Sequence, residues 1–418
     1  MRILVVGGGG REHALAWSLS RHGHRVWCAP GNAGTPGNIP IAADDLAGLV
    51  RLAREGHIEL VVVGPEAPLV AGLVDALTAA GIAAFGPSAA CAALEGSKAF
   101  SKDAMARWGV ATAASVTVTS IEDGLAALDR FDVAPVVKAS GLAAGKGVIV
   151  PDDRAGAEAA LRLMFIERAF GSAADEVVLE QRLIGREVSV LAVCSGTEYR
   201  LLVPAQDHKR LGDGDAGPNT GGMGAFAPAP SLGGDLLATV GDRAIAPILH
   251  GMVDRGTPYV GVLYAGLMLT DAGPLVLEYN CRLGDPEAQV ILPLLADDPA
   301  ELFLAAVRGT LSGLTLSWTP GAAATVVMAA AGYPDAPRPG DLISGLAEAE
   351  AAGCHVFHAG TAESPQGPRT AGGRVLAVTG VGADLDAAVA RAYAGVEAIA
   401  FAGAQFRHDI GRTIPEAT

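Results

Sequence analysis

The chain has 418 residues, half of them hydrophobic, and a formal net charge of −15. This length predicts two to four domains with substantial cores, and the hydrophobic content excludes a disordered chain. The negative charge disfavours nucleic acid and anionic lipid as partners, so a bound polyphosphate needs a local cluster of cations.

We expect no membrane association, because the longest uncharged stretch, 309–333, is interrupted by Pro320 and several glycines. The first residues lack the long apolar segment of a signal peptide. Five cysteines lie far apart without a C-x-x-C pair, which argues against disulfides and structural zinc. A cytoplasmic location is therefore expected.

Residues 1–100 alternate predicted strands and helices. Apolar, β-branched runs at 2–6, 25–30 and 58–65 are typical of parallel strands that are buried on both faces. Helices are expected at about 11–21 and 70–80. The pattern predicts a small, doubly wound α/β domain.

Four consecutive glycines, 7–10, join the first strand to its helix. Free backbone N–H groups and the positive helix end there suit a phosphate, and a purely structural tight turn is the alternative. The run is not a dinucleotide fingerprint, because Glu12 or His13 occupies the place of the third glycine. This disfavours a dehydrogenase.

From about residue 100 a helix is followed by hairpin-like strands. Segment 138–147 resembles a phosphate loop but is no Walker A motif, since its glycines are too close and Gly147 replaces the Ser/Thr. Lys138 lies inside an apolar strand, with Lys146 at the hairpin tip. A buried lysine needs an anion opposite, which can be a ligand or a nearby structural acid.

Residues 180–189 connect two strands, where free backbone groups suit an adenine edge and Glu187 suits ribose hydroxyls, although any hairpin would look similar. The charged run Asp207 to Arg210 then precedes a glycine-rich passage, 212–224. We expect that passage to be a mobile loop over a site, and a solvated charge cluster is the alternative for the run.

A predicted strand at 274–277 leads into E-Y-N-C-R-L-G-D-P-E at 278–287. Alternate side chains of a strand share a face, so Glu278, Asn280 and Arg282 can point together. Carboxylate and amide oxygens suit Mg²⁺ beside nucleotide phosphates, and the fork of Arg282 suits an anion. The combination predicts phosphoryl transfer, whereas a simple salt bridge between Glu278 and Arg282 is the alternative.

The last hundred residues predict a compact α+β unit, with strands near 324–330, 355–361 and 374–380 and a helix at about 384–399. His355 and His358 resemble an H-x-x-H metal pair. In a strand these two side chains face opposite sides, so no metal is predicted there.

Eight strings, in order, resemble the glycinamide ribonucleotide synthetase family of ATP-grasp ligases. They are G-G-G-G-R-E-H-A-L-A-W, A-P-G-N-A-G-T, V-V-G-P-E-A-P-L-V, E-G-S-K-A-F-S-K-D, K-A-S-G-L-A-A-G-K-G-V, Q-D-H-K-R, G-P-N-T-G-G-M-G-A and E-Y-N-C-R-L-G-D-P-E. The resemblance extends from Met1 to about Arg412 and includes V-F-H-A-G-T and G-G-R-V-L.

This resemblance implies an N-terminal doubly wound α/β domain at 1–100, an ATP-grasp region at 101–310 with a mobile lid at about 112–185, and a small C-terminal α+β domain at 320–418. It implies ATP as co-substrate, Mg²⁺ or Mn²⁺ as metal, and glycine and 5-phosphoribosylamine as substrates. The product is glycinamide ribonucleotide, formed through glycyl phosphate in purine biosynthesis. A monomer or weak homo-oligomer is expected.

Site residues follow by position in the matching strings. ATP would meet Lys98, Lys138, Gly141, Gly145, Lys146, Gly147, Glu180, Leu183 and Glu187, and the metal would meet Glu278 and Asn280. The substrate contacts come from the expected mechanism and not from position. The sugar phosphate would meet Gly8, Gly9, Gly10, Gly31 and Asn32, glycine or the amine would meet Asp207, Lys209 and Asp285, and Arg282 would meet an anion, with Arg282, Lys138 and Asp285 catalytic.

Two departures from the family pattern stand out. Ser140 occupies the place of an expected Asp, and Leu267 lies where many ATP-grasp enzymes carry a second metal carboxylate. The rivals are another ATP-grasp ligase, such as a biotin carboxylase-like or D-alanine–D-alanine ligase-like enzyme, and a nucleotide-sensing module. A sensing module would lack the metal pair, so it ranks below the ligases.

Overall fold

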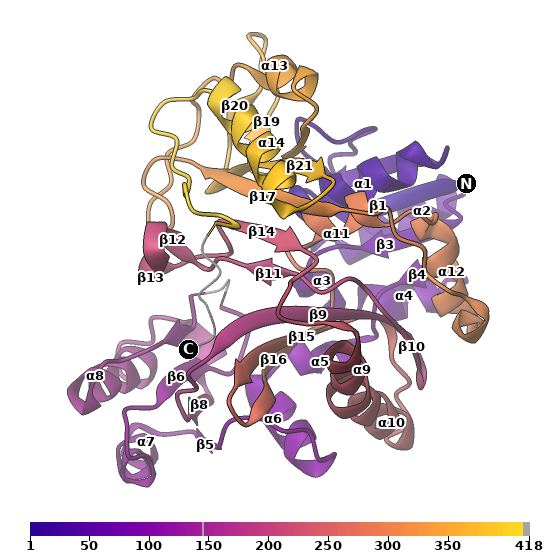
Figure 1. The fold of residues 1–418 in the computed structure, drawn as a ribbon. Helices are drawn as coiled ribbons and strands as arrows, with labels where there is room; N and C mark the ends of the chain where they lie inside the picture. The colour runs from indigo at the N-terminus through magenta and orange to yellow at the C-terminus, as the bar shows by residue number, and fades with distance from the viewer. Residues whose placement is uncertain (144–145, 413–418) are drawn as a thin grey trace.

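The computed structural model describes residues 1–143 and 146–412 (Figure 1). The N-terminal region contains β1 (Arg2–Gly7), α1 (Gly10–Arg21), β2 (Arg25–Pro30), α2 (Leu46–Glu55), β3 (Leu60–Val63), α3 (Glu66–Val70), α4 (Leu73–Ala79) and β4 (Ala84–Phe85). Its strands form a parallel sheet in the order β2-β1-β3-β4.

Alternate residues of β1 pack against different helices. Ile3 and Val5 share a core with Leu15 of α1, whereas Leu4 and Val6 share another with α2 and α4. Both faces of the sheet are therefore covered, and the predicted doubly wound arrangement is confirmed. The helix expected near 70–80 is observed as α4, which begins only at Leu73 because Gly72, at φ +88°, separates it from α3.

The central region contains two antiparallel four-stranded sheets. The first has the order β5-β8-β6-β7 and the second β10-β9-β15-β16. Their elements are α5 (Ala89–Gly96), α6 (Lys98–Arg107), β5 (Ser115–Val118), α7 (Ile121–Ala127), β6 (Val136–Ala139), β7 (Val148–Ile149), α8 (Arg154–Phe165), β8 (Val177–Glu180), β9 (Arg186–Ser195), β10 (Glu198–Leu201), α9 (Gly234–Val240), α10 (Ala246–Asp254), β15 (Val260–Thr270) and β16 (Gly273–Asn280).

The helical stretch Gly234–Asp254 is the one part of the described chain with the length and hydropathy of a membrane-spanning helix. Its buried residues, among them Val240, Ile248 and Met252, pack in one core cluster with residues of β9 and β15. Packing inside the fold therefore accounts for these apolar side chains.

The C-terminal region is built on a five-stranded antiparallel sheet in the order β11-β14-β17-β21-β18. Its elements are β11 (Gln206–Asp207), β14 (Gly224–Ala227), α11 (Ala288–Leu294), α12 (Pro299–Arg308), β17 (Ala322–Ala329), α13 (Leu346–Ala351), β18 (His355–His358), β21 (Arg374–Gly382) and α14 (Leu385–Ala398), with the short pair β19 (Thr361–Ala362) and β20 (Arg369–Thr370) beside it. Two strands that precede residue 230 thus join this sheet, beside β17 in Figure 1.

Much of the glycine-rich passage 212–224, which was expected to be a mobile loop, belongs to a short hairpin. The hairpin is formed by β12 (Arg210–Gly212) and β13 (Ala216–Asn219), and the passage ends at the first residue of β14. The buried guanidinium of Arg407 pairs with Asp215 at 2.6 Å and with Asp409 at 2.7 Å, and it donates to the carbonyl of Arg210. The loop prediction is therefore wrong, because a distant arginine supplies donors that anchor the hairpin.

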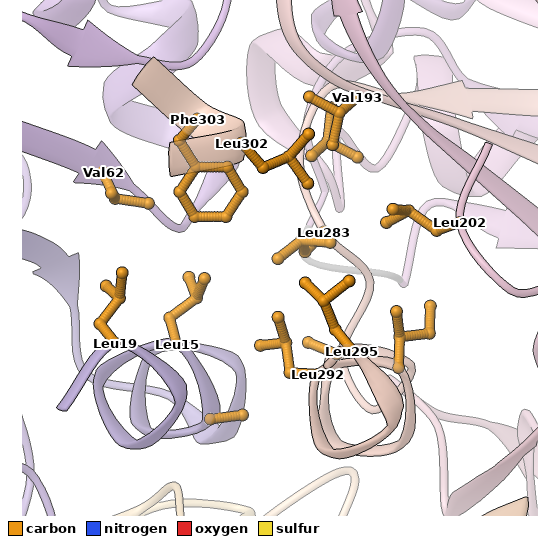
Figure 2. Packing of buried hydrophobic residues seen from close by; sticks show 14 of the residues in the cluster. Leu15, Leu19, Val62, Val193, Leu202, Leu283, Leu292, Leu295, Leu302 and Phe303 are labelled. Carbon is orange, nitrogen blue, oxygen red and sulfur yellow. The ribbon is translucent and has the colours of Figure 1, made fainter. Parts of the chain in front are cut away.

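One hydrophobic cluster joins the three regions. Figure 2 shows Leu15 and Leu19 of α1 facing Val62 and Phe303, and Leu292 of α11 and Leu295 at its C-terminal end near Leu283. Leu283 lies just beyond the end of β16, the strand that carries Glu278 and Asn280, with Cys281 and Arg282 between them. The end of that strand is consequently fixed by the shared core.

Candidate active site

Glu278 and Asn280 lie on the same face of β16. The register places Glu278 opposite Gly266 and Asn280 opposite Tyr264 on β15, and Gly266 is also paired with Ser189 on β9. Cross-strand partners share a face, so these residues form one polar surface, as strand alternation predicts. Ala265 and Leu267, the residues on either side of Gly266 in β15, belong to the hydrophobic core on the other face.

Four cations surround Glu278, which is half-buried. Burial alone would raise the pKa of this carboxyl, but Lys209, Lys138, Lys98 and Arg282 together lower it below its ordinary value. The carboxylate is therefore ionised at neutral pH. A chain with a net charge of −15 needs a local cluster of cations to bind a polyphosphate, and this group of cations is such a cluster.

Arg282 is held by two acids that the sequence did not single out. Its Nη2 lies 2.7 Å from Glu95 Oε1, and its Nε lies 3.5 Å from Glu66 Oε2. Glu95 also accepts the N–H of Cys281 at 2.7 Å. The ion pairs of the described residues thus join Arg282 to α5 and α3, and the alternative pairing with Glu278 is not the one observed.

Lys138 faces a buried acid on the neighbouring strand. Its Nζ lies 2.7 Å from Glu180 Oε2, and Lys102 Nζ lies 3.0 Å from the other oxygen. The sequence left open whether the anion opposite Lys138 is a ligand or a structural acid, and in this structure Glu180 is a structural acid at that place. Glu180 had been matched through its backbone alone, and its side chain brings two lysines together.

The start of α6 is tied to the segment after Lys138. Ser140 Oγ accepts the N–H of Ala99 at 3.1 Å, and the Ser140 carbonyl accepts the N–H of Lys98 at 2.8 Å. Ser97 caps the same helix by accepting the N–H of Phe100 at 3.1 Å. The departure at Ser140 thus supplies a neutral acceptor for the first turn of the helix that carries Lys98.

Four glycine and lysine positions of the predicted lid loop have different environments. Gly141 donates to the carbonyl of Ala173 at 2.8 Å, and the Gly147 carbonyl accepts from Ala139 at 2.8 Å. Lys146 is exposed. Gly145 lies outside the described residues.

The connector residues and the charged run after β9 meet in space. Lys209 Nζ lies 3.0 Å from Glu187 Oε2, although the two residues were matched to different ligands. Burial raises the pKa of Asp207, which Lys209 partly opposes and Glu287 and Glu187 reinforce. Leu183 is half-buried in the same connector. The contact places Glu187, the predicted ribose acceptor, next to Lys209, a residue predicted to lie near glycine or the amine.

The glycine turn is closely packed against the loop that begins at Gly31. A Cβ on Gly8 would lie 2.5 Å from the Gly31 carbonyl oxygen, and Gly31 has φ +73°. Asn32 Nδ2 donates to the carbonyls of Gly8 at 3.0 Å and His358 at 2.7 Å, while its Oδ1 accepts the N–H of Gly34 at 2.8 Å. The Asn32 amide therefore braces the turn, in keeping with the structural alternative.

Gly9 and Gly10 also have neighbours within the protein. The N–H of Gly9 donates to Glu12 Oε2 at 2.6 Å. A Cβ on Gly10 would lie 2.5 Å from Gln289 Nε2. Neighbouring groups lie so close to the backbone of this turn that a side chain would not fit, so glycine is required there whether or not the turn binds a ligand.

Asp285 joins the glycine turn to the C-terminal sheet. Its carboxylate accepts the N–H of Arg11 at 3.3 Å and Gln289 Nε2 at 2.9 Å, and it lies 3.3 Å from Arg374 Nη1. Burial would raise the pKa of Asp285, but Arg374 and Arg11 lower it overall. Arg374 also donates to the carbonyl of Gly221 at 2.6 Å. The sequence analysis did not predict a role for Arg374, which it included only as the arginine of the family string G-G-R-V-L.

The donor set at Glu278 and Asn280 fits a hard cation that also binds a phosphate. Among the described residues no three His, Cys, Asp or Glu side chains gather as a metal site. One ionised carboxylate and one amide oxygen leave most ligand positions to nucleotide oxygens or water, as Mg²⁺ prefers. Leu267 lies in the core on the opposite face and adds no ligand.

Three family models together match most of the chain. The N domain of phosphoribosylglycinamide synthetase matches residues 1–95, its ATP-grasp (A) domain matches 96–288, and its C domain matches 323–413. The matches follow the order of the three regions described above.

Relatives support the same assignment. The phosphoribosylamine–glycine ligase of Allochromatium vinosum is 49% identical over 98% of this chain and 98% of its own length. A trifunctional purine biosynthetic protein, adenosine-3 of Gallus gallus, is 49% identical over 98% of this chain, which spans 42% of that protein.

A crystal structure of the phosphoribosylamine–glycine ligase from Thermotoga maritima has a TM-score of 0.85 at 35% identity and covers 98% of this chain and 100% of that one. Both the sequence and the architecture agree with the family models. The chain therefore belongs to the phosphoribosylglycinamide synthetase family, with an ATP-grasp domain between its N-terminal and C-terminal domains.

Proposed function

We propose that this chain is an ATP-dependent ligase that joins glycine to 5-phosphoribosylamine and releases glycinamide ribonucleotide, ADP and phosphate. The observation that carries the proposal is the group of four cations around the ionised Glu278, beside Asn280, in a member of this family. Such a group suits the polyphosphate of ATP.

The chemistry requires activation of glycine. A carboxylate does not react with an amine at neutral pH, because its charge is delocalised and an oxide is a poor leaving group. A glycine oxygen attacks the γ-phosphorus of ATP, the bond to the β-phosphate oxygen breaks, and glycyl phosphate and ADP form. The amine then attacks the acyl carbon, phosphate departs and the amine loses a proton. No protein nucleophile is needed.

We assign the nucleotide to the face of the central sheets. Lys98 and Lys138 would bind its phosphates, the backbone at Glu180 and Leu183 its adenine, and Glu187 its ribose. Glu278 and Asn280 would hold Mg²⁺ or Mn²⁺, which when bound neutralises charge on the phosphates. Arg282 would contribute further positive charge, since its pKa is raised although burial opposes this.

We assign the lid role to the loop with Gly141, Gly145, Lys146 and Gly147, within a lid at about 112–185. A closed lid excludes water that would hydrolyse the acyl phosphate. Support comes from the adjoining strands, since Lys138 on β6 is paired with Val148 on β7 at the base of this loop.

We assign the sugar phosphate to the other side of the site. Gly8, Gly9, Gly10 and Gly31 would present backbone at the start of α1, and Asp285 would orient the substrate together with Arg374. Asn32 would act mainly by bracing the turn, because its amide hydrogen bonds are already made within the protein.

Asp207 and Lys209 would lie near glycine or the reacting amine. Arg282, Lys138 and Asp285 are the residues that we propose to be catalytic. We also propose three domains, at 1–100, 101–310 and 320–418. We expect the protein to be cytoplasmic and to be a monomer or a weak homo-oligomer.

The decisive experiment supplies purified protein with ATP, Mg²⁺, glycine and freshly generated phosphoribosylamine, and measures ADP and the amide product. Omission of any one substrate should abolish amide formation. A panel of other acids and amines separates this ligase from other ATP-grasp ligases. ADP release that depends on a different acid or amine would overturn the proposed substrates.

A further inference from the structure

Lys102 is a deeply buried cation that no role above includes. It is 7% exposed and lies on α6, one turn after Lys98. Its Nζ lies 3.0 Å from Glu180 Oε1 and donates to Thr112 Oγ1 at 2.7 Å. Thr112 in turn donates to the carbonyl of Val276 on β16 at 2.5 Å. Lys102 therefore links α6 and β8 to the strand that leads to the proposed metal ligands.

Glu180 stands between two lysines. It is 1% exposed, with Lys102 at one carboxylate oxygen and Lys138 at the other. The oxygen facing Lys138 makes an ion pair but has no hydrogen bond of good geometry. The three groups carry one net positive charge, and Lys138 is held by charge more than by a directed bond.

A nucleotide phosphate at Lys138 would compete with Glu180 for the same ammonium group. If Lys138 were the only cation at Glu180, its movement toward a phosphate would leave a buried carboxylate without a partner, which is strongly unfavourable. Lys102 removes this obstacle, because it neutralises Glu180 from the opposite oxygen.

We infer that Lys102 is a positioning residue for nucleotide binding, which acts through Glu180 to leave Lys138 available to the phosphates. The inference rests on the proposed function, in which Lys138 binds ATP. Lys102 is not proposed to touch the nucleotide, since its ammonium group already contacts Glu180 and Thr112.

The test compares Lys102→Met, Glu180→Gln and the double variant in the ADP-release assay. For Lys102→Met we expect the KM for ATP to rise at least about tenfold, which corresponds to about 1.4 kcal/mol, while the KM for glycine stays within about twofold. The double variant lacks the carboxylate that captures Lys138, so it should recover at least about threefold of that loss.

Arg107→Met is the matched control, because Arg107 lies on the same helix and its side chain is 67% exposed in a pair with Asp103. We expect it to leave the KM for ATP unchanged. If Lys102→Met does not fold, the double variant is compared with Glu180→Gln alone, and equal KM values for ATP are expected.

Two results would overturn the inference. One is a lower melting temperature of Lys102→Met with an unchanged KM for ATP, which indicates a purely structural residue. The other is a double variant with no recovery. If the wild type lacks ligase activity, the proposed function fails separately. The shift of melting temperature caused by MgATP then replaces KM as the measure of nucleotide binding in the same variants.

Discussion

The two sides of the candidate active site use charge differently. The nucleotide side comprises Lys98, Lys138, Glu180, Glu278 and Asn280, and here cations converge on a half-buried carboxylate. The glycine-turn side comprises Gly8, Gly9, Gly10, Gly31, Asn32, Asp285 and Arg374, and here polar groups largely contact one another.

The difference indicates two kinds of site. The side-chain amide of Asn32 already makes hydrogen bonds with two carbonyls and one N–H group of the protein. The carboxylate of Asp285 already accepts hydrogen bonds from Arg11 and Gln289. Among the cations around Glu278, Lys138, Lys209 and Arg282 are each paired with another acid, yet together with Lys98 they still lower the pKa of Glu278 against its burial. The nucleotide side is thus arranged for incoming negative charge, whereas the glycine-turn side is arranged to keep a shape.

Glu278→Ala should give the largest effect, on the nucleotide side. Loss of this carboxylate removes the proposed metal ligand, and we expect kcat to fall by about 10² to 10³. Steady-state ADP release at saturating substrates measures the change. Asp271→Ala, in the exposed turn of the same hairpin, is the control and should keep normal turnover. Near-normal turnover of Glu278→Ala would contradict the metal assignment.

Arg374→Met tests the glycine-turn side. The substitution removes the ion pair with Asp285 and the hydrogen bond to the Gly221 carbonyl, and should lower the free energy of unfolding by about 2 to 3 kcal/mol. We expect the KM for phosphoribosylamine to rise while the KM for ATP stays constant. Denaturant unfolding and substrate titrations measure both effects. An equal rise in both KM values would show that the two sides are not separable.

Mild acid should weaken the glycine-turn side through His13, which is half-buried, and His358, which is buried. Burial, with repulsion from His358, lowers the pKa of His13 to about 3, and burial lowers that of His358 to about 4. Both values lie below the ordinary 6.5, so between pH 6.5 and these values the unfolded chain binds protons that the folded chain does not. Stability is present above pH 6.5 and lost as the pH falls, by about 2 kcal/mol per histidine at pH 5.

Denaturant unfolding between pH 7.5 and pH 5 checks this expectation. His13→Asn keeps an acceptor near the position of Nδ1, which accepts the N–H of His358 at 2.8 Å. The variant should lose about half of the pH dependence that these two residues cause. A wild-type stability that does not fall toward pH 5 would contradict the prediction.

Ser140→Ala should give the smallest effect. It removes the acceptor for the N–H of Ala99 in the first turn of α6, which costs about 1 kcal/mol of stability. The KM for ATP should rise by less than about threefold, because Lys98 begins that turn. Ser120→Ala, at the cap of α7, should cost similar stability without a change in KM. If Ser120→Ala raised the KM for ATP more than Ser140→Ala does, the effect of Ser140 could not be attributed to its hydrogen bond with α6.

Local pattern was enough to predict much of the nucleotide side. Alternation along β16 predicted that Glu278 and Asn280 share a face, and the apolar strand around Lys138 predicted an anion opposite. The identity of that anion, Glu180, could not be predicted, because it depends on which strand lies beside β6. The partners of Arg282, Glu95 and Glu66, were missed for the same reason.

By itself the sequence determined several of the strands and helices, the doubly wound N-terminal domain and the resemblance to a ligase family, because periodicity and turn chemistry depend on neighbours along the chain. The tertiary structure alone decided that 210–219 forms a hairpin anchored by Arg407, and that Arg374 reaches Asp285. Ion pairs and hydrogen bonds act over a few ångströms of space, so only the fold decides which distant residues meet.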